Sequence, residues 1–427
     1  MLKRKKIRTP DAILVAILLL TILIYLLLSI KKEKPKPLYD FGKAFNELNI
    51  RKIDKAKLRS SITIAAEYLM DNIDDDGKFV YKRNKDSTVE VNHKYNTLRH
   101  AGSVYALCRY YEYSNDKRAL EAVVRTAGYL KRNMLAPIKM HDNLMGVWSR
   151  PQINNDGSTA IVKLGGNGLG LLALSNVEKL KAGFISADTL DMIADFLLFM
   201  QKPNGGFYSK YYPGKKQRDD SWTSLYYPGE AALGLLSLYE LNNKPKYLNA
   251  AADALAYLAK KRKGKLRVEA DHWALIATSV LFAKDENIKA NKKNIRLHGI
   301  QVSKSILLEN PQNISSSPYF GSLSSDGRVT PTATRMEGLL AALQFIPHER
   351  ESLIYSIVLT INKGVGFLMN SQIKEGELKG GIPRQRIVTD SLAMSYGVKP
   401  DLNRMGEVRI DYVQHALCAM IQYDELF

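Results

Sequence analysis

Acidic, basic and aromatic side chains stand at or near the start of several apolar helical segments. Five of them could transfer protons or attack a carbon atom: Tyr227, Glu230, Asp271, Glu337 and Asp411. Nine more could bind a polar ligand: Asn96, Arg99, His100, Trp222, Tyr226, His272, Arg335, Arg409 and His415. Carboxyl groups serve as acids or bases, arginine binds anionic groups, and aromatic faces stack on sugar rings.

Glu230 is distinguished by a comparison of the chain with itself. A shift of 64 residues places Glu230 on Gly166, and a shift of 128 residues places it on Gly102. Two related helices therefore carry glycine where the third carries a carboxylate. A catalytic role competes here with a structural one, as a helix cap or as a partner of the helix dipole.

The other candidates also have structural alternatives. Asp271 could be the N-cap of a helix. Glu337 could form an ion pair with Arg335, two residues before it. Asp411 and His415 stand four residues apart and could bond to each other on one helix face. Their shared position at the start of successive helices favours a common site.

Aromatic residues gather before and at the start of the third apolar helix. They are Tyr208, Tyr211, Tyr212, Trp222, Tyr226 and Tyr227. Such faces suit sugar rings, and Lys215, Lys216 and Arg218 would add contacts to a carboxylated or sulfated sugar. Packing within the loop is the alternative, just as a core position is the common fate of a histidine such as His100.

Motifs for metals and cofactors are missing. The seven histidines show no HExxH pattern, and there is no paired CxxC, Walker loop or GxSxG elbow. GGNGLG (165–170) follows no βαβ pattern and is not a dinucleotide site. We therefore expect no metal and no cofactor. The two cysteines, Cys108 and Cys418, allow one disulfide at most, so the fold must be stable through packing.

An internal repeat explains how remote residues come together. Residues 107–130 align without gaps with residues 235–258, and eight of the 24 positions are identical. Each segment contains a helix end, a turn with asparagine and an amphipathic helix. A shift of 64 residues places GLGLLAL (168–174) near ALGLLSL (232–238), so one unit is a helix pair of about 64 residues.

Six such pairs are predicted. Helices rich in small and apolar residues begin within 99–107, 165–174, 228–236, 271–281, 334–343 and 411–420. More amphipathic partners are expected near 60–72, 118–134, 187–201, 246–262, 299–309 and 352–372. Because small residues let helices crowd together, the first set suits an inner ring and the second an outer ring. This predicts an all-α domain over 46–427, an (α/α)6 toroid of six helical hairpins.

An open helical solenoid would show similar periodicity, but no polar capping repeat is evident. In a closed toroid all inner helices begin at the same rim, where their N-termini favour anions. The candidate residues would meet at this rim. The turn-rich segments 74–84, 204–214 and 379–386 are expected as loops or short hairpins at one end of the ring.

Residues 11–30 are apolar enough and long enough to cross a bilayer. No small-residue cleavage site follows, so we expect a retained anchor rather than a signal peptide. Residues 1–10 form a basic tail and residues 31–45 a stiff linker with Pro35 and Pro37. We expect a single-pass protein of the cell membrane, with a cytoplasmic N-terminus and the bulk of the chain outside the cytoplasm.

The formal net charge is +19, of which residues 1–40 contribute +6. The remaining +13 belongs to the large domain and favours anionic partners such as acidic polysaccharide or phospholipid. Membrane anchoring argues against nucleic acid. A generally lysine-rich composition is the alternative explanation of this charge.

The architecture resembles the six-hairpin, (α/α)6-toroid carbohydrate-active enzymes. The segment YYPGEAALGLLSLYELNNKPKYLNAAADALAYL (226–258) resembles the C-terminal domain of glucuronyl C5-epimerases. The resemblance covers roughly 60–425 as architecture and about thirty residues at the level of motifs. It implies a polysaccharide that lies across the rim.

The resemblance also implies roles. In epimerases and related lyases a tyrosine or carboxylate removes the C5 proton of a uronic acid, while Arg, Asn or His neutralises the sugar carboxylate; Tyr227, Glu230, Arg99 and His100 match these roles. In glycosidases of this architecture two carboxylates act instead. The candidates for them are Glu230, Asp271, Glu337 and Asp411.

Two hypotheses follow. The first is an enzyme that processes an acidic extracytoplasmic polysaccharide, by hydrolysis or by C5 proton abstraction. The second is a non-catalytic glycan-binding component of an envelope polysaccharide assembly system, with assembly proteins as partners. A terpenoid-cyclase-like toroid would need a DxDD-type motif, which the sequence lacks.

Overall fold

The computed structural model describes residues 45–47, 50–92, 94–139, 141–155, 159–215, 217–284, 288–309, 314–401 and 403–427. The chain divides into a unit Met1–Tyr39 and a unit Asp40–Phe427, and all described residues belong to the second. The basic tail (1–10), the membrane anchor (11–30) and the linker up to residue 44 lie outside the described residues.

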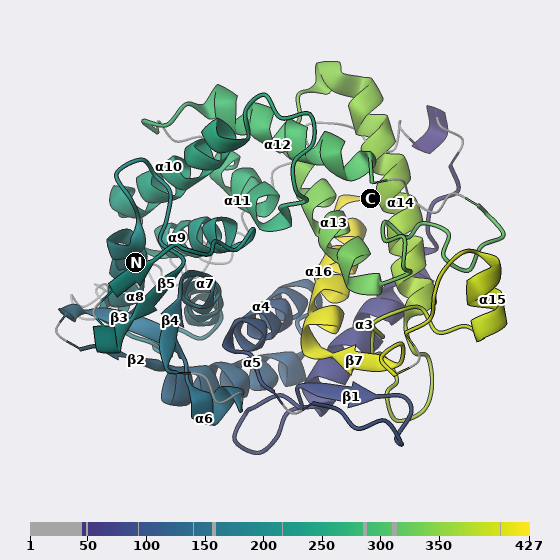
Figure 1. Cartoon of the computed structure of the whole chain (residues 1–427), viewed down its shortest axis with the longest axis horizontal. Coiled ribbons are helices and arrows are strands. Elements are labelled where there is room, and N and C mark those ends of the chain that lie inside the picture. Colours follow the sequence, from purple (N-terminus) through teal and green to yellow (C-terminus); the bar gives the residue numbers. More distant parts are fainter. Residues whose placement is uncertain are drawn as a thin grey trace, which may run out of the picture. The chain divides into compact units, whose positions relative to one another are not determined.

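Twelve long helices of the described unit alternate between an outer and an inner ring (Figure 1). The outer helices are α3 (Lys55–Asp71), α5 (Lys117–Tyr129), α8 (Ala187–Met200), α10 (Pro245–Arg262), α12 (Lys292–Leu307) and α14 (Glu351–Ser371). The inner helices are α4 (Thr97–Ser114), α7 (Leu164–Leu180), α9 (Tyr227–Asn242), α11 (His272–Phe282), α13 (Val329–Ala342) and α16 (Ile410–Leu426). Each predicted helix is present, with bounds shifted by a few residues.

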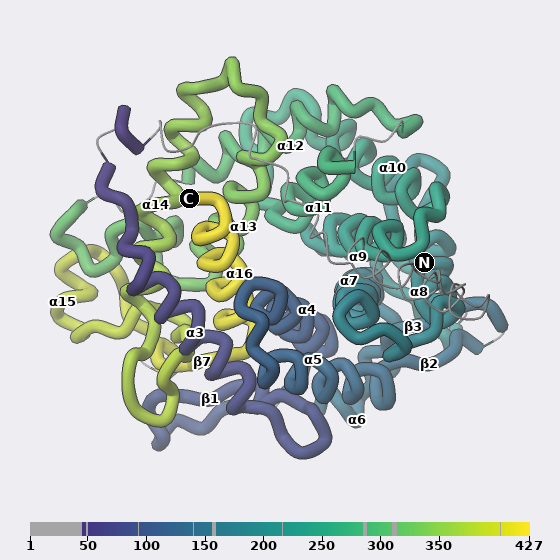
Figure 2. Tube along the Cα trace, turned by 180° about the vertical axis from the view of Figure 1, so that it is seen from behind, coloured from purple at the N-terminus to yellow at the C-terminus, as the bar shows by residue number. Residues whose placement is uncertain are grey.

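The inner ring is closed. Every inner helix packs against the next one along the chain, and the last, α16, packs against the first, α4. Figures 1 and 2 show the yellow α16 beside the blue α4 from both sides. The prediction of a closed (α/α)6 toroid is thereby confirmed. Cys108 on α4 and Cys418 on α16 are both buried free cysteines, with no disulfide between them.

Glycines allow the inner helices to approach closely. A Cβ atom at Gly168 of α7 would lie 2.6 Å from the backbone carbon of Glu230 on α9. A Cβ at Gly234 would lie 2.4 Å from the carbonyl oxygen of Gly168. Real side chains do not tolerate such distances, so the helix backbones touch where the sequence is richest in small residues.

The asparagines shared by the two halves of the repeat end inner helices. Asn115 and Asn243 adopt the left-handed conformation, with φ of 56° and 52°. Their backbone N–H groups donate to the carbonyl oxygens of Tyr111 and Tyr239, at 2.8 and 2.9 Å. Asparagine tolerates this conformation better than most residues, which explains its presence at both turns.

Short strands lie in the connections. The strands β2 (Leu135–Ile138), β3 (His141–Ser149), β4 (Ile161–Lys163), β5 (Lys210–Tyr212) and β6 (Gln217–Asp219) form one antiparallel sheet in that order, and β1 (Lys82–Asn84) pairs with β7 (Glu407–Arg409). The remaining elements are the single turns η1 (Leu130–Met134), α6 (Pro151–Asn154), η2 (Pro213–Lys215), η3 (His348–Arg350) and α15 (Asp390–Ser395). Loops or short hairpins were expected in 74–84, 204–214 and 379–386; β1 lies in the first and β5 in the second, whereas the strand β3 was not predicted.

One described helical stretch, His348–Ser371, is long and apolar enough to cross a membrane by length and composition. It contains α14, which packs against α12, α13 and α16. Half of its most apolar window is buried within the ring. This packing accounts for its apolar composition, as in the core helix of a globular domain.

Candidate active site

A pocket of about 420 Å³ lies where the inner helices begin. It is lined by side chains from all six inner helices and from the connections that precede α9 and α16. Ten of the fourteen predicted site residues line it: Asn96, Arg99, Tyr226, Tyr227, Glu230, His272, Arg335, Arg409, Asp411 and His415. The rim therefore gathers residues separated by up to 319 positions in the chain.

Two predicted site residues, Asp271 and His100, are buried in structural contacts and do not line the pocket. Asp271 is fully buried, accepts from the backbone N–H of Ala274 at 3.1 Å and pairs with Arg262 at 2.9 Å. It is an N-cap and does not line the pocket. His100 is also fully buried, between the Tyr95 hydroxyl at 2.7 Å and the Thr126 carbonyl at 2.9 Å.

Trp222 and Glu337 lie just behind the pocket wall. The Trp222 side chain is 52% exposed, and its ring meets that of Tyr227 edge-on at 5.8 Å. Glu337 is buried and reaches the pocket only through His415, which it contacts directly. Neither residue lines the pocket itself.

Several polar residues that line the pocket were not among the predicted site residues, and these include Arg328, Arg384 and Gln414. A signal for the first was present. Arg328 stands directly before α13, just as Arg409 stands directly before α16, and both occupy the N-cap position. Arg384 lies in the turn-rich segment 379–386 that was expected at the end of the ring.

Two acids line the pocket, Glu230 and Asp411, and Glu230 has the fewer polar contacts. Its side chain is 5% exposed in the first turn of α9, and its Oε2 atom has no hydrogen-bond partner among the described residues. Gly165 on α7 makes room for it, since a Cβ there would lie 2.0 Å from Oε2. Burial, with a smaller effect from negative Asp271, raises the pKa of Glu230 to about 8. Glu230 therefore carries a proton at neutral pH.

Asp411 is the ionised carboxylate of the pocket. Arg409 donates to both of its oxygens, at 2.5 and 3.0 Å, and the Arg99 Nε lies 3.0 Å from Oδ2. Burial opposes the charge of Asp411, but Arg99 and Arg409 lower its pKa below the usual range. Asp411 therefore bonds to these arginines and not to His415, which corrects the alternative considered from the spacing.

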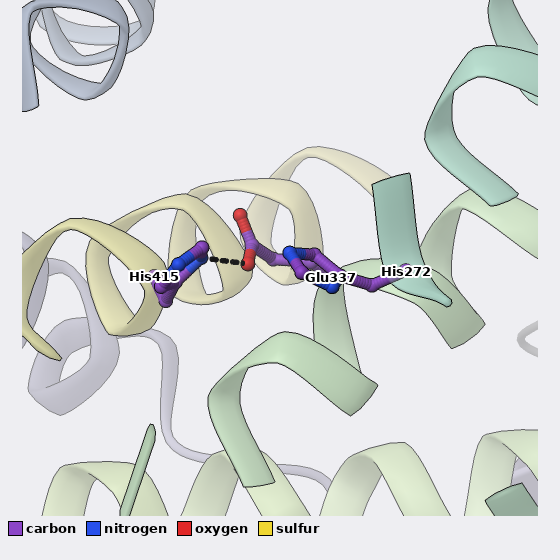
Figure 3. Close-up of side chains that lie close together, drawn as sticks. All are labelled: His272, Glu337 and His415. Carbon is purple, nitrogen blue, oxygen red and sulfur yellow. Dashed lines mark hydrogen bonds and ion pairs between the residues drawn. The ribbon is translucent and has the colours of Figure 1, made fainter. Parts of the chain in front are cut away.

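Glu337 and His415 form a buried pair across α13 and α16 (Figure 3). His415 Nδ1 lies 2.6 Å from Glu337 Oε2. Burial raises the pKa of Glu337 against the opposing effect of His415. Burial also disfavours the charged form of His415, yet the charge and hydrogen bond of Glu337 raise the pKa of His415. Both groups therefore bind a proton more readily than they do at their ordinary pKa values.

The pairing of Glu337 corrects the ion pair expected with Arg335. Arg335 instead bonds to Glu309 and donates to the carbonyl oxygen of Pro331 at 2.9 Å. Arg335 and Glu337 are two residues apart on α13, so their side chains point to different sides of the helix and contact different neighbours.

His272 completes the cluster (Figure 3). It is 1% exposed, and neither ring nitrogen has a hydrogen-bond partner in the described part of the chain. Its ring meets the His415 ring at 5.2 Å and the Tyr226 ring at 5.0 Å, both edge-on. Burial, assisted by His415 and Arg335, lowers the pKa of His272 well below the usual value. The pKa values of the two neighbouring imidazoles are therefore shifted in opposite directions.

Among the described residues, His272, Glu337 and His415 also form a group that could hold a metal ion, with donor atoms within 4.8 Å of one another. Two ligands bound at about 2.1 Å to one tetrahedral ion stand more than 3 Å apart. The 2.6 Å between His415 and Glu337 is instead the length of a hydrogen bond that shares a proton. The arrangement suits proton transfer better than coordination.

Five arginines line the pocket: Arg99, Arg328, Arg335, Arg384 and Arg409. Arg328 and Arg384 pair with Asp326 at 2.6 Å and Asp401 at 3.2 Å, acids that do not line the pocket. Arg99 and Arg409 both pair with Asp411, and Arg409 also lies 4.0 Å from Glu407, which does not line the pocket. The wall that faces a ligand is therefore cationic, and it suits a carboxylated, sulfated or phosphorylated molecule.

Comparisons with known proteins identify the fold. No family model and no curated protein matches the chain. Solved structures do match. A D-mannose isomerase aligns with a TM-score of 0.61 and 14% identity over 87% of this chain and 98% of its own. The cellobiose 2-epimerase of Bacillus thermoamylovorans B4167 aligns with a TM-score of 0.62 and 10% identity over 87% of this chain and 99% of its own.

An unsaturated glucuronyl hydrolase of Streptococcus agalactiae gives a TM-score of 0.54 and 15% identity, over 92% of this chain and 98% of its own. These matches are carbohydrate-active enzymes built on the (α/α)6 toroid. The expected likeness to that structural class is therefore confirmed.

Proposed function

We propose that this protein is a carbohydrate-active enzyme that moves a proton on an acidic sugar unit, as an epimerase or a lyase does. The observation that carries the proposal is the histidine pair of the pocket. The rings of His272 and His415 meet edge-on at 5.2 Å, and their surroundings shift their pKa values in opposite directions. Two neighbouring groups with such different proton affinities are the usual mark of a base and an acid.

The chemistry follows from the charges of the wall. A uronic acid carries a C–H bond next to its carboxylate, and loss of that proton sends the bonding electrons onto the carboxylate oxygens. Arginines that bind these oxygens stabilise the added charge. His272 has a ring nitrogen without a hydrogen-bond partner among the described residues and can accept the proton, whereas the His415–Glu337 pair can return a proton to the carbon. Return of a proton from the other face of the carbon gives an epimer.

Glu230 allows a second outcome after the same proton abstraction, namely elimination of the glycosidic oxygen. Because its pKa of about 8 keeps the carboxyl protonated, it can protonate the glycosidic oxygen that departs from the neighbouring carbon. The products are then an unsaturated uronate and a shortened chain. Tyr227, whose pKa is raised by burial, stays a phenol at neutral pH and suits hydrogen bonding to the sugar rather than proton abstraction.

The names of the similar structures agree with chemistry on sugars. An isomerase and an epimerase are among them, and so are hydrolases, which agree with the second candidate below. The glucuronyl hydrolase name refers to a uronic acid derivative, which agrees with the arginine-rich wall.

Glycoside hydrolysis is the second candidate. It is favoured by one observation, namely that a protonated carboxyl, Glu230, and an ionised one, Asp411, line the same pocket. Inverting and retaining glycosidases need such a pair. The two arginines on Asp411 argue against this role, since they occupy both oxygens that would activate water or attack the sugar.

A binding-only role agrees less well with the buried polar groups. An unpaired buried polar atom costs about 1–3 kcal/mol. His272 and Glu230 together leave three such atoms without partners among the described residues. A module that only binds a glycan has no need for that cost, whereas an acid and a base do.

For the cellular setting we propose that residues 11–30 anchor the protein in the cell membrane, with residues 46–427 outside the cytoplasm. The run of 19 apolar or near-neutral residues after Asp11 supports the anchor. An acidic extracytoplasmic polysaccharide would then be within reach of the pocket. Protease protection of a tagged C-terminus in sealed vesicles tests the orientation.

The experiment for the activity uses the full chain in mild detergent and a panel of uronic acid polymers in heavy water. Epimerisation places deuterium on carbon without shortening the chain, a lyase gives unsaturated ends with ultraviolet absorbance, and hydrolysis gives shorter chains with neither signal. We expect His272→Asn to abolish deuterium incorporation or elimination. The matched control is His141→Asn, a histidine on β3 outside the pocket. Full activity of His272→Asn would refute the proposal.

A further inference from the structure

A second hollow adjoins the pocket. It has a volume of about 460 Å³ and lies along the C-terminal end of α10 and the segment that precedes α9. Ser224 lines both hollows. The pocket and this groove therefore meet at one small side chain, with Tyr227 on the pocket side and Pro228 on the groove side.

The far wall of the groove carries two exposed lysines beside one exposed acid, Glu269. Lys261 and Lys265 form no ion pair with any residue that the structure describes. They belong to the segment KKRKGKLR (260–267), in which Arg262 is buried and pairs with Asp271 at 2.9 Å and with Glu269 at 3.9 Å. Since an outer helix runs antiparallel to the next inner one, this segment lies at the same rim as the start of α11.

An exposed aromatic ring stands beside the junction. Trp222 is two residues from Ser224, is 52% exposed and rests on Tyr227 of the pocket wall. The Lys210 ammonium lies 5.0 Å from the centre of its ring. An aromatic side chain with about half of its surface exposed suits stacking on a sugar ring.

We propose that the substrate is a polyanionic glycan of several units that runs from the pocket over Ser224 into this groove. The reacting unit lies in the pocket, the next stacks on Trp222, and the anionic groups of later units bind Lys261 and Lys265. The inference depends on the proposed function only for the statement that the unit in the pocket reacts. Binding along the groove stands on its own.

The same basic segment could instead contact anionic lipid, because Leu266 at its tip is 90% exposed. The glycan is favoured by the continuity between groove and pocket. A membrane contact would need no hollow behind the lysines and no opening toward the arginines at Ser224.

The test measures binding of uronic acid oligomers of two and six units, with defined ends, to the full chain in detergent. We expect the hexamer to bind on the order of tenfold more tightly than the dimer, and this gain to fall as salt rises. In Lys261→Glu/Lys265→Glu we expect the gain to disappear while affinity for the dimer stays unchanged. The control is Lys292→Glu/Lys293→Glu, the same change of charge at the opposite end of the ring, on α12.

Three results would overturn the proposal. The first is equal affinity of the wild type for dimer and hexamer. The second is an equal loss in the groove variant and the control, which would mean that only net charge matters. The third is loss of binding to phosphatidylserine vesicles in the groove variant with hexamer affinity retained. His272→Asn is included because length-dependent binding that survives in an inactive variant separates this inference from the proposed chemistry.

Discussion

Replacement of Glu230 by glutamine should stabilise the fold while it removes a reactive group. The folded chain holds the pKa of Glu230 at about 8, against an ordinary value of 4.5. Below pH 4.5 the carboxyl is protonated in both states and has no effect. Between these values the unfolded chain loses the proton while the folded chain keeps it, so wild-type stability falls as pH rises.

The magnitude follows from the two pKa values. Each unit of difference between them is worth about 1.4 kcal/mol, so the wild type loses ~3 kcal/mol between pH 4.5 and 7 and ~5 kcal/mol above pH 8. Glutamine does not titrate. Whatever its packing costs, the difference in unfolding free energy between Glu230→Gln and wild type should therefore grow with pH by this amount.

Urea unfolding of residues 40–427 at pH 5, 7 and 9 measures this difference. Glu240→Gln on the same helix is the matched control. Burial disfavours the charge of Glu240, but Lys179 and Lys284 lower its pKa, so its contribution is present at neutral pH and is lost on acidification. The two variants should thus diverge from wild type with opposite signs. A Glu230→Gln difference that does not change with pH would refute the assignment of a protonated Glu230.

Three further predictions concern the site. Glu337→Gln removes the charge that raises the pKa of His415, so the imidazole should lose its proton at lower pH. The pKa from NMR titration of His415 and the pKa of the alkaline limb of the rate profile should both fall. An unchanged pKa of His415 would contradict the pairing. Arg99→Met should weaken binding of a uronic acid dimer by about 1.5–3 kcal/mol, the worth of a hydrogen bond to a charged group, and leave a neutral dimer unaffected; equal losses for both sugars would contradict an anion site. Prolonged chelation with EDTA should leave the rate unchanged, because the histidine pair acts by proton transfer; activity restored only by added metal would reverse this assignment.

The ring was predictable because its information is local and repeated. Apolar spacing marks each helix, and the alignment of residues 107–130 with residues 235–258 fixes the unit. Because each outer helix runs antiparallel to the inner helix that follows it, all inner helices begin at the same rim. The sheet was missed since β4, β5 and β6 have three residues each, too few to show an alternating pattern, and they exist only because distant connections pair with one another.

The partners of charged groups were not predictable from spacing. Arg335 is two residues from Glu337 yet bonds to Glu309, and Asp411 bonds to Arg99, 312 residues away in the chain, in place of nearby His415. These choices depend on which helix faces each side chain. Sequence periodicity gives the face of a helix but not the identity of the neighbour across it.

The glycines of the inner helices connect the repeat to the site. Gly165 on α7 leaves room for Glu230 on α9, and a Cβ at Gly102 on α4 would lie 2.5 Å from Gln414 on α16. A Cβ at Gly338 on α13 would lie 2.9 Å from the Leu275 side chain and 3.1 Å from the Cβ of His272, both on α11. In each case a side chain of one inner helix occupies the space that a glycine of the adjacent helix leaves open, and at Gly165 and Gly102 that side chain is polar. Glu230 replaces a glycine of the related units, and Gly165 on the adjacent helix leaves the space that the Glu230 side chain fills. The ring can therefore bury a functional group where the adjacent inner helix has a glycine.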